Sequence, residues 1–250
     1  MVPELCGGAP AGAVDRYGLR ALVRQAAGRL AAAGVTSPQV DARILAEHLL
    51  GRALLLADGA DGDFPAAYDA LVLRRECREP LQHIIGRMWL RGAELISRPG
   101  VFIVRPETEV LAGLAIDEAR SVVGSRGEAR VVDLCTGSGA IALAVATEAA
   151  RTEVWAVEKE PDPFALACHN RDRIGARGVH LERGDATNPA TLPFLNGLVD
   201  VVVTNPPYVP ADEMPTQPEA SADPHSALYG GSEDGLDIPA RIIRRALTLL

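Results

Sequence analysis

The second half of this 250-residue chain alternates short apolar runs with helical patterns, and this alternation constrains the fold more than any other feature. Runs rich in valine and leucine predict strands over 129–134, 153–157, 179–182 and 199–204. Apolar residues at helical spacing predict helices over 108–123, 139–150, 163–174 and 238–250. Strands that are apolar on both faces and alternate with helices form a parallel sheet covered on both sides. We therefore expect an α/β fold with a doubly wound sheet.

The first third of the chain is helical by pattern. Helices are predicted from Leu19 to Gly34, from Ser37 to Gly51 and from Asp63 to about Cys77, with a short turn over 53–56. Short β-like runs at 88–90, 94–96 and 101–104 then predict a hairpin. The expected segments are a disordered tail (1–14), an N-terminal helical domain (15–82), a β-hairpin linker (83–105) and the doubly wound domain (106–250).

Charge is distributed unevenly along the chain. Residues 1–100 carry 12 basic against 11 acidic side chains, whereas residues 101–250 carry 13 against 22. Such an acidic half is a poor surface for a nucleic-acid backbone, so direct nucleic-acid binding is not expected. The longest apolar runs are too short for a membrane span, and the N-terminus lacks the pattern of a signal peptide, so no membrane association and a cytoplasmic location are expected. The four scattered cysteines predict neither disulfides nor a zinc site.

A glycine-containing loop follows the first strand of the predicted sheet. The strand ends at Leu134 and runs through Cys135-Thr136-Gly137-Ser138-Gly139 into a helix. This is the ligand crevice of a doubly wound sheet. Glu158 ends the second strand 19 residues past Gly139, where a carboxylate can accept hydrogen bonds from both hydroxyls of a ribose. The site suits an adenosine-type cofactor, although residues 137–142 also satisfy the dinucleotide pattern G-x-G-x-x-A.

The fourth strand runs directly into Asn205-Pro206-Pro207-Tyr208. The two prolines have fixed φ angles and no N–H, so the backbone here presents carbonyl oxygens without competing donors. A planar NH₂ group can donate to the Asn205 side-chain oxygen and to the Pro206 carbonyl while Tyr208 packs on its plane. A nicotinamide dehydrogenase does not account for this tetrapeptide.

These motifs resemble those of class I S-adenosylmethionine-dependent methyltransferases that act on planar NH₂ groups. More narrowly, the chain resembles the release factor glutamine N5-methyltransferases, the HemK or PrmC family. The likeness runs from about Glu79 to Leu250 in five ordered blocks, at 79–86, 105–109, 133–142, 205–208 and 227–237. The resemblance implies a Rossmann-like class I methyltransferase sheet preceded by a small helical bundle and a hairpin linker. It also implies that the helical domain binds the substrate protein.

The resemblance implies a role for each motif residue. Asp133, Thr136, Gly137, Ser138 and Gly139 would line the methionine part of S-adenosylmethionine, which leaves as S-adenosylhomocysteine. Glu158 would hold the ribose, Asp185 would approach the adenine, and Glu107 and Thr108 would border the pocket. The acceptor would be the Gly-Gly-Gln glutamine of class 1 peptide chain release factors, held by Asn205, Pro206, Pro207 and Tyr208. The chain departs from the family pattern at His83, Val104, Cys135 and Glu158.

Catalysis is expected to depend mainly on positioning, because an amide nitrogen is a poor nucleophile and the sulfonium leaves as a neutral thioether. Asn205 and the Pro206 carbonyl would orient the nitrogen and stabilise its developing positive charge, with no dedicated general base. Two alternatives stay open: a DNA or RNA amino-methyltransferase, which shares the tetrapeptide, and a cofactor-binding module without turnover.

Two further expectations concern surfaces. Arg74, Arg75 and Arg78 are expected to form a solvated basic edge of the third helix. Candidate strands are found only for positions one to four of a class I sheet, so the fourth strand is expected to lie at an edge. On that basis the sequence is expected to resemble a C-terminally truncated member of the family, less stable and more prone to associate than a complete enzyme.

Overall fold

A computed structural model describes residues 13–213 and 218–250. Its contacts divide the chain into two compact units, Met1–Ile85 and Gly86–Leu250, which are described separately below. The expected tail over 1–14 lies outside the described residues except at its end, where Val14 begins a short strand. Within the described residues, every helix is too short or too polar to cross a membrane.

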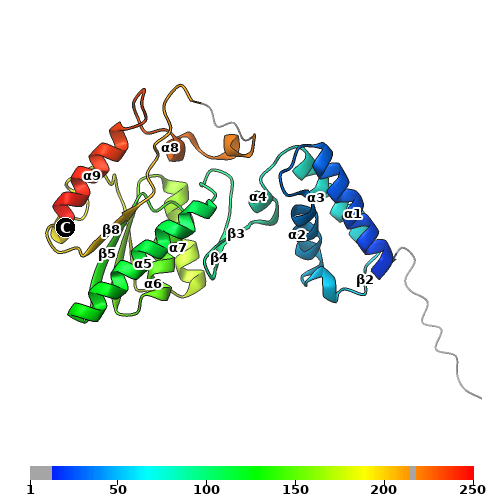
Figure 1. Ribbon diagram of the computed structural model, residues 1–250, viewed down its shortest axis with the longest axis horizontal. Coiled ribbons are helices and arrows are strands. Elements are labelled where there is room, and N and C mark those ends of the chain that lie inside the picture. Colours follow the sequence, from blue (N-terminus) through cyan, green and yellow to red (C-terminus); the bar gives the residue numbers. More distant parts are fainter. Residues whose placement is uncertain (1–12, 214–217) are drawn as a thin grey trace, which may run out of the picture. The chain divides into compact units, whose positions relative to one another are not determined.

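The first unit is a small helical bundle (Figure 1). It contains α1 (Arg16–Ala32), α2 (Pro38–Leu50), α3 (Phe64–Glu76), α4 (Leu81–Ile85) and the 3₁₀ turn η1 (Leu54–Leu56). A two-residue antiparallel pair joins β1 (Val14–Asp15) to β2 (Gly59–Ala60). The three long helices agree with the sequence patterns, and their apolar stripes meet in one core around Leu19, Leu30, Leu45 and Val72. The fourth helix was not predicted, because five residues are too few to show a helical period.

The prediction that Arg74, Arg75 and Arg78 form a solvated basic edge is wrong for Arg75. Its side chain is buried and its Nε donates to Asp41 Oδ2 of α2 at 2.8 Å. Arg74 pairs with Glu79 at the surface, and Arg78 Nη1 donates to the Ala33 carbonyl. The pattern at 74–78 favours a solvated edge because arginines usually lie outside a core, whereas Arg75 is buried against a carboxylate from another helix.

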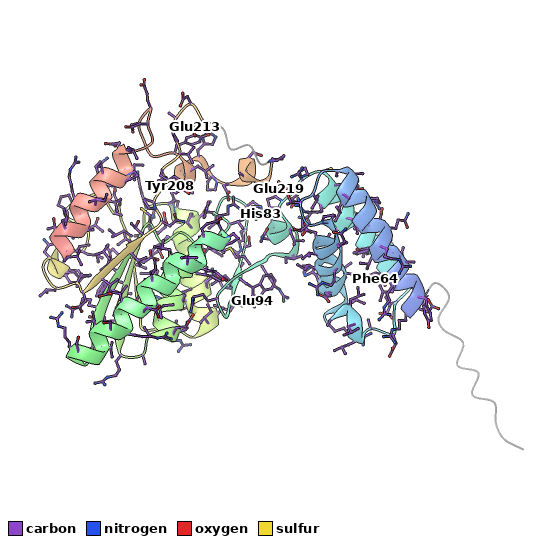
Figure 2. All side chains as sticks on the ribbon, in the orientation of Figure 1. Phe64, His83, Glu94, Tyr208, Glu213 and Glu219 are labelled. Carbon is purple, nitrogen blue, oxygen red and sulfur yellow. The ribbon has the colours of Figure 1, made fainter. Side chains whose placement is uncertain are left out.

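The second unit begins with a β-hairpin of β3 (Arg87–Leu90) and β4 (Ala93–Ile96). Figure 2 labels Glu94 on this hairpin, where it pairs with Arg87 and with Arg173 of α7 (Pro161–Ile174). The third predicted run, at 101–104, is not a strand. Its backbone forms a hydrogen bond with a side chain and not with a neighbouring strand, since the Ile103 N–H donates to the Asp223 carboxylate.

The rest of the second unit is the predicted doubly wound sheet. Its four parallel strands have the order β7-β6-β5-β8, with bounds Val179–Arg183, Thr152–Glu158, Ala129–Leu134 and Val201–Thr204. The chain therefore places β6 and then β7 on one side of β5, and it crosses over to place β8 on the other side of β5. The crossing makes the carboxyl end of β5 a topological switch point, where such sheets bind ligands. In the described part of the chain β8 pairs with β5 alone, so it forms an edge, as predicted.

Helices cover both faces of this sheet. On one face, alternate residues such as Val131, Val154 and Val203 pack with α5 (Pro106–Arg126) and α6 (Ala140–Glu148). On the other face, Val132 and Leu134 pack with Ile242 and Leu249 of α9 (Asp237–Leu249). In Figure 1, α5, α6 and α7 lie on one side of the strands and α9 on the other. The short elements η2 (Pro193–Leu195), η3 (Pro218–Ala222) and α8 (His225–Leu228) were not predicted.

Replacing Asp41 with alanine should destabilise the helical unit by about 3–5 kcal/mol, because the buried Arg75 charge would lose the carboxylate that its Nε binds. Hydrogen exchange at the slowest amides of α2 measures this free energy of local unfolding.

Glu79→Gln is the matched control, because it breaks the exposed ion pair to Arg74 and should cost less than about 1 kcal/mol. Equal effects of the two substitutions would contradict the assignment of Asp41–Arg75 as a core interaction.

Candidate functional site

A cavity of about 550 Å³ lies at the carboxyl ends of the strands. This volume is in the range of small-molecule sites. Segments that follow all four strands contribute to its lining, together with the start of α5 and the segment that contains α8. Its lining includes most of the predicted site residues, namely Glu107, Thr108, Thr136, Gly137, Ser138, Glu158, Asp185, Asn205, Pro206, Pro207 and Tyr208. The sheet thus brings together motifs that are up to 101 residues apart in the sequence.

The loop between β5 and α6 has an unusual backbone. Cys135, Gly137 and Gly139 all have positive φ angles, of 61°, 59° and 84°. A Cβ at Gly139 would come within 3.3 Å of both Ala167 Cβ and Leu143 Cδ1, so glycine here permits close packing of the loop on α7. Cys135 adopts the conformation without being glycine, which is a strained position at the site. Burial raises the pKa of its thiol to about 12, so the thiol stays neutral.

Asp133 lies under this loop and does not line the cavity. Its Oδ2 accepts hydrogen bonds from Thr136 Oγ1 at 2.5 Å and from the Ala142 N–H at 3.2 Å. Its Oδ1 is buried and has no hydrogen-bond partner among the described residues. Complete burial raises the pKa of this carboxyl to about 7, against the smaller lowering effect of the two hydrogen bonds. A buried acceptor without a partner favours a cationic or hydrogen-donating ligand group nearby.

Glu158 turns its carboxylate toward the same loop. Its Oε2 accepts from the Gly137 N–H and its Oε1 from the Glu160 N–H, both at 2.8 Å. Burial raises the pKa of Glu158, and these two backbone bonds oppose that rise. The Gly137 N–H, which a dinucleotide site would offer to a pyrophosphate, is therefore already given to a carboxylate. This contact favours an adenosine ligand without phosphates over the dinucleotide reading of the same pattern.

Asp185 follows β7 at the rim of the cavity. It accepts from both the N–H and the hydroxyl of Thr187, at 2.8 and 2.7 Å. Burial raises the pKa of Asp185, but the Thr187 hydrogen bonds and the charge of Lys159 outweigh it, so the pKa lies below its usual value. An ionised carboxylate at this position can accept from an exocyclic amino group.

The acceptor tetrapeptide continues directly from β8. Thr204 Oγ1 donates to the Leu134 carbonyl at 2.7 Å, which fixes the end of β8 beside the glycine loop. Pro207 is buried, Asn205 and Pro206 are half-buried, and Tyr208 is 62% exposed. Figure 2 labels Tyr208 at this end of the sheet, close to α8. An open aromatic ring beside two carbonyl acceptors can receive a planar amide from outside the molecule.

Sequence reasoning missed several lining residues. Phe102 and Arg105 precede α5, Tyr229 ends the α8 segment, and Arg241 comes from α9. Tyr229 stands in the block at 227–237, so the resemblance could have flagged it. Gly139, like Asp133, supports the loop but does not line the cavity.

The cavity fits S-adenosylmethionine. The carboxylates of Glu158 and Asp185 and the neutral Cys135 thiol line it and suit a ligand with a nucleoside end and a cationic amino-acid end, while the unpartnered Asp133 Oδ1 lies buried under the loop. The dinucleotide alternative would need backbone amides for its anionic pyrophosphate, but the amides of Gly137 and Ala142 already donate to carboxylates. No histidine, cysteine or acidic cluster suited to a metal ion occurs among the described residues.

The pKa of Asp133 predicts how the stability of the cofactor-free chain depends on pH. The usual carboxyl pKa is about 4, so between there and about 7 the folded chain holds a proton that the unfolded chain has released. This stabilising contribution is complete below the unfolded pKa and is lost as the pH rises through about 7.

We expect the stability difference between the wild-type chain and Asp133→Asn to fall by about 2–3 kcal/mol from pH 5 to pH 8. Guanidinium unfolding of both proteins across this range measures it. A difference that does not change with pH would show that Asp133 is already ionised at pH 5.

Comparisons with known proteins agree with this geometry. The PrmC N-terminal domain model matches residues 21–86, and the Methyltransferase small domain model matches residues 94–218. A release factor glutamine methyltransferase of Streptomyces coelicolor is 50% identical over 235 residues, which cover 93% of this chain and 81% of that protein. The corresponding proteins of Bifidobacterium longum and Deinococcus radiodurans are 43% and 38% identical and cover 92% and 93% of this chain, and 82% of each relative. The chain therefore belongs to the release factor glutamine methyltransferase family, and its doubly wound unit is a methyltransferase domain that uses S-adenosylmethionine.

Proposed function

We propose that this chain transfers a methyl group from S-adenosylmethionine to the side-chain amide nitrogen of the glutamine in the Gly-Gly-Gln motif of class 1 peptide chain release factors. The observation that carries the proposal is the shared cavity. The glycine loop and Glu158, which suit the cofactor, line the same 550 Å³ space as Asn205–Tyr208, which suits a planar amide. Cofactor and acceptor can therefore meet in one site.

The cofactor residues have distinct roles in this proposal. Asp133 holds the loop through Thr136 and the first turn of α6 through Ala142, and its charge lies under the part of the cavity proposed for the amino-acid end. Glu158 fixes Gly137 and can accept from the ribose hydroxyls with its remaining lone pairs. Asp185 faces the adenine end, and Glu107 and Thr108 close the cavity from α5. Gly139 allows the loop to pack closely on α7.

The acceptor residues act by orientation. Asn205 Oδ1 and the Pro206 carbonyl accept the two amide hydrogens, and Pro206 and Pro207 add no competing N–H. Tyr208 packs on the plane of the amide. When bound, S-adenosylmethionine supplies a methyl group on a sulfonium that leaves with the C–S electron pair as a neutral thioether. As the new N–C bond forms, the two acceptor oxygens stabilise the positive charge on nitrogen until its extra proton passes to water.

Substrate recognition is proposed to involve the helical unit, since a family model for this N-terminal domain accompanies the methyltransferase domain. The glutamine-bearing loop would enter at Tyr208. A nucleic-acid amino-methyltransferase shares the tetrapeptide, but the 13 basic against 22 acidic residues of 101–250 disfavour binding of a phosphate backbone.

One assay tests the proposal against its alternatives. Labelled methyl transfer is measured to a class 1 release factor, to the same factor with its loop glutamine replaced by alanine, and to duplex DNA. Transfer to the first substrate alone is expected. Transfer to DNA would favour the nucleic-acid enzyme, and cofactor binding without transfer would favour a binding module.

Glu158→Ala should weaken S-adenosylmethionine binding at least about tenfold, because each charge-assisted hydrogen bond to the ribose contributes about 1.5–3 kcal/mol. Calorimetric titration gives the Kd. Glu153→Gln, at the opposite end of β6, is the control and should leave the Kd unchanged. An unchanged Kd for Glu158→Ala would remove this residue from the ribose site.

Asn205→Ala should leave cofactor binding intact and lower kcat by about 100-fold, since loss of one preorganised partner of the reacting group costs about 3 kcal/mol. Steady-state methylation of the release factor measures kcat, and calorimetry checks the cofactor Kd. Near-normal turnover would rule out the orienting role of Asn205.

A further inference from the structure

The acceptor tetrapeptide is held from outside the sheet. It emerges from β8, which pairs on one side only in the described part of the chain. The N–H groups of Tyr208 and Val209 both donate to the Leu228 carbonyl, at 2.9 and 2.7 Å, and the Gly230 N–H donates to the Val209 carbonyl at 3.0 Å. The position of Asn205–Tyr208 therefore depends on the segment at 223–230.

Asp223 begins that segment and fixes it to the other wall of the cavity. Its side chain is completely buried. Oδ1 accepts from the Ile103 N–H at 3.1 Å, and Oδ2 accepts from Arg105 Nη2. One carboxylate thus holds both a backbone amide and a guanidinium from the stretch that precedes α5, 118 residues earlier in the chain.

Arg105 connects this carboxylate to the cofactor side. Its guanidinium lies over the Phe102 ring, 5.1 Å from the centroid, and its own N–H donates to Thr108 Oγ1 at 3.3 Å. Phe102, Arg105 and Thr108 all line the cavity. The stack and the ion pair therefore set where the first turn of α5 lies relative to the segment that carries the acceptor loop.

We infer that Asp223 and Arg105 are positioning residues that fix where the acceptor tetrapeptide Asn205–Tyr208 lies relative to the cofactor-binding residues of the same cavity. The inference rests on the proposed function, because it assigns the pair a part in that reaction. Neither residue touches the reacting atoms in this role. Methyl transfer requires the attacking nitrogen, the methyl carbon and the departing sulfur to lie in line, so a small shift of the acceptor loop lowers the rate more than it lowers cofactor affinity.

The chain offers a matched control at the other end of β8. The Asp200 carboxylate accepts from a guanidinium, that of Arg126, and from a backbone amide, the Arg130 N–H at 2.8 Å. Asp223 makes the same two kinds of interaction, but Asp200 comes before β8 in the chain and Asp223 comes after it. Asp200→Asn therefore weakens a like set of interactions at the start of β8, whereas Asp223→Asn weakens the set that holds the segment after β8.

The test compares Asp223→Asn, Arg105→Gln, Arg105→Lys, Asp200→Asn and the unchanged full chain. Asp223→Asn and Arg105→Gln should lower kcat for release factor methylation between about tenfold and about 100-fold and keep the cofactor Kd within about threefold. The double variant should lose little more than either single variant. Arg105→Lys should recover part of kcat, and Asp200→Asn should keep it near the unchanged value.

Amide hydrogen exchange gives a readout that needs no substrate. The amides of Tyr208, Val209 and Gly230 should exchange faster in Asp223→Asn and Arg105→Gln but not in Asp200→Asn. Unchanged exchange at these amides, or a fall in kcat no larger than that of Asp200→Asn, would overturn the inference. If the unchanged chain fails to methylate the release factor, the proposed function fails, and the exchange data still decide whether the pair holds the acceptor loop. Should Asp223→Asn fail to fold, Arg105→Gln decides alone, since that side chain is partly exposed.

Discussion

The buried carboxylate of Asp133 is the interaction on which the cofactor side of the site depends. Asp133 lies one residue before the end of the inner strand β5, and it binds both the loop that follows and the first turn of α6 through Thr136 and Ala142. Burying a carboxylate costs free energy, and this one has an oxygen with no hydrogen-bond partner in the part of the chain that the structure describes. A cofactor that brings a positive group would relieve that cost, so binding and loop order are coupled at this residue.

Two further bridges tie the loop to its surroundings. Glu158 holds Gly137 from the neighbouring strand. Asn170, fully buried in α7, donates to the Ser138 carbonyl at 3.0 Å and accepts from the Ile96 N–H of the hairpin at 2.8 Å. The hairpin is thus connected to the cofactor loop through one side chain. The loop is thus held by side chains from β5, β6 and α7, and these contacts can maintain the strained backbone at Cys135.

The acceptor side is built differently, because it depends on loops and not on the sheet. Gly235 has a φ of 72°, and a Cβ there would lie 2.3 Å from the Tyr208 carbonyl oxygen. A side chain would therefore push the 230–237 loop off the backbone of the acceptor segment. Together with the bonds to Leu228, this close approach fixes the segment after β8, which pairs with β5 alone in the described part of the chain. Loops positioned by a rigid scaffold commonly carry such functions.

The sequence by itself determined the alternation of strands and helices, the parallel sheet and the two motifs, because hydrophobic period, glycine at positive φ and proline act locally. Tertiary structure alone decided three matters. Arg75 is buried because its partner Asp41 comes from another helix, and the 101–104 run is not a strand because Asp223 takes its N–H. Gly137 donates to Glu158, which separates an adenosine site from a dinucleotide site of identical spacing. Each of these contacts joins residues at least 21 positions apart, and a local sequence pattern cannot predict a partner at that distance.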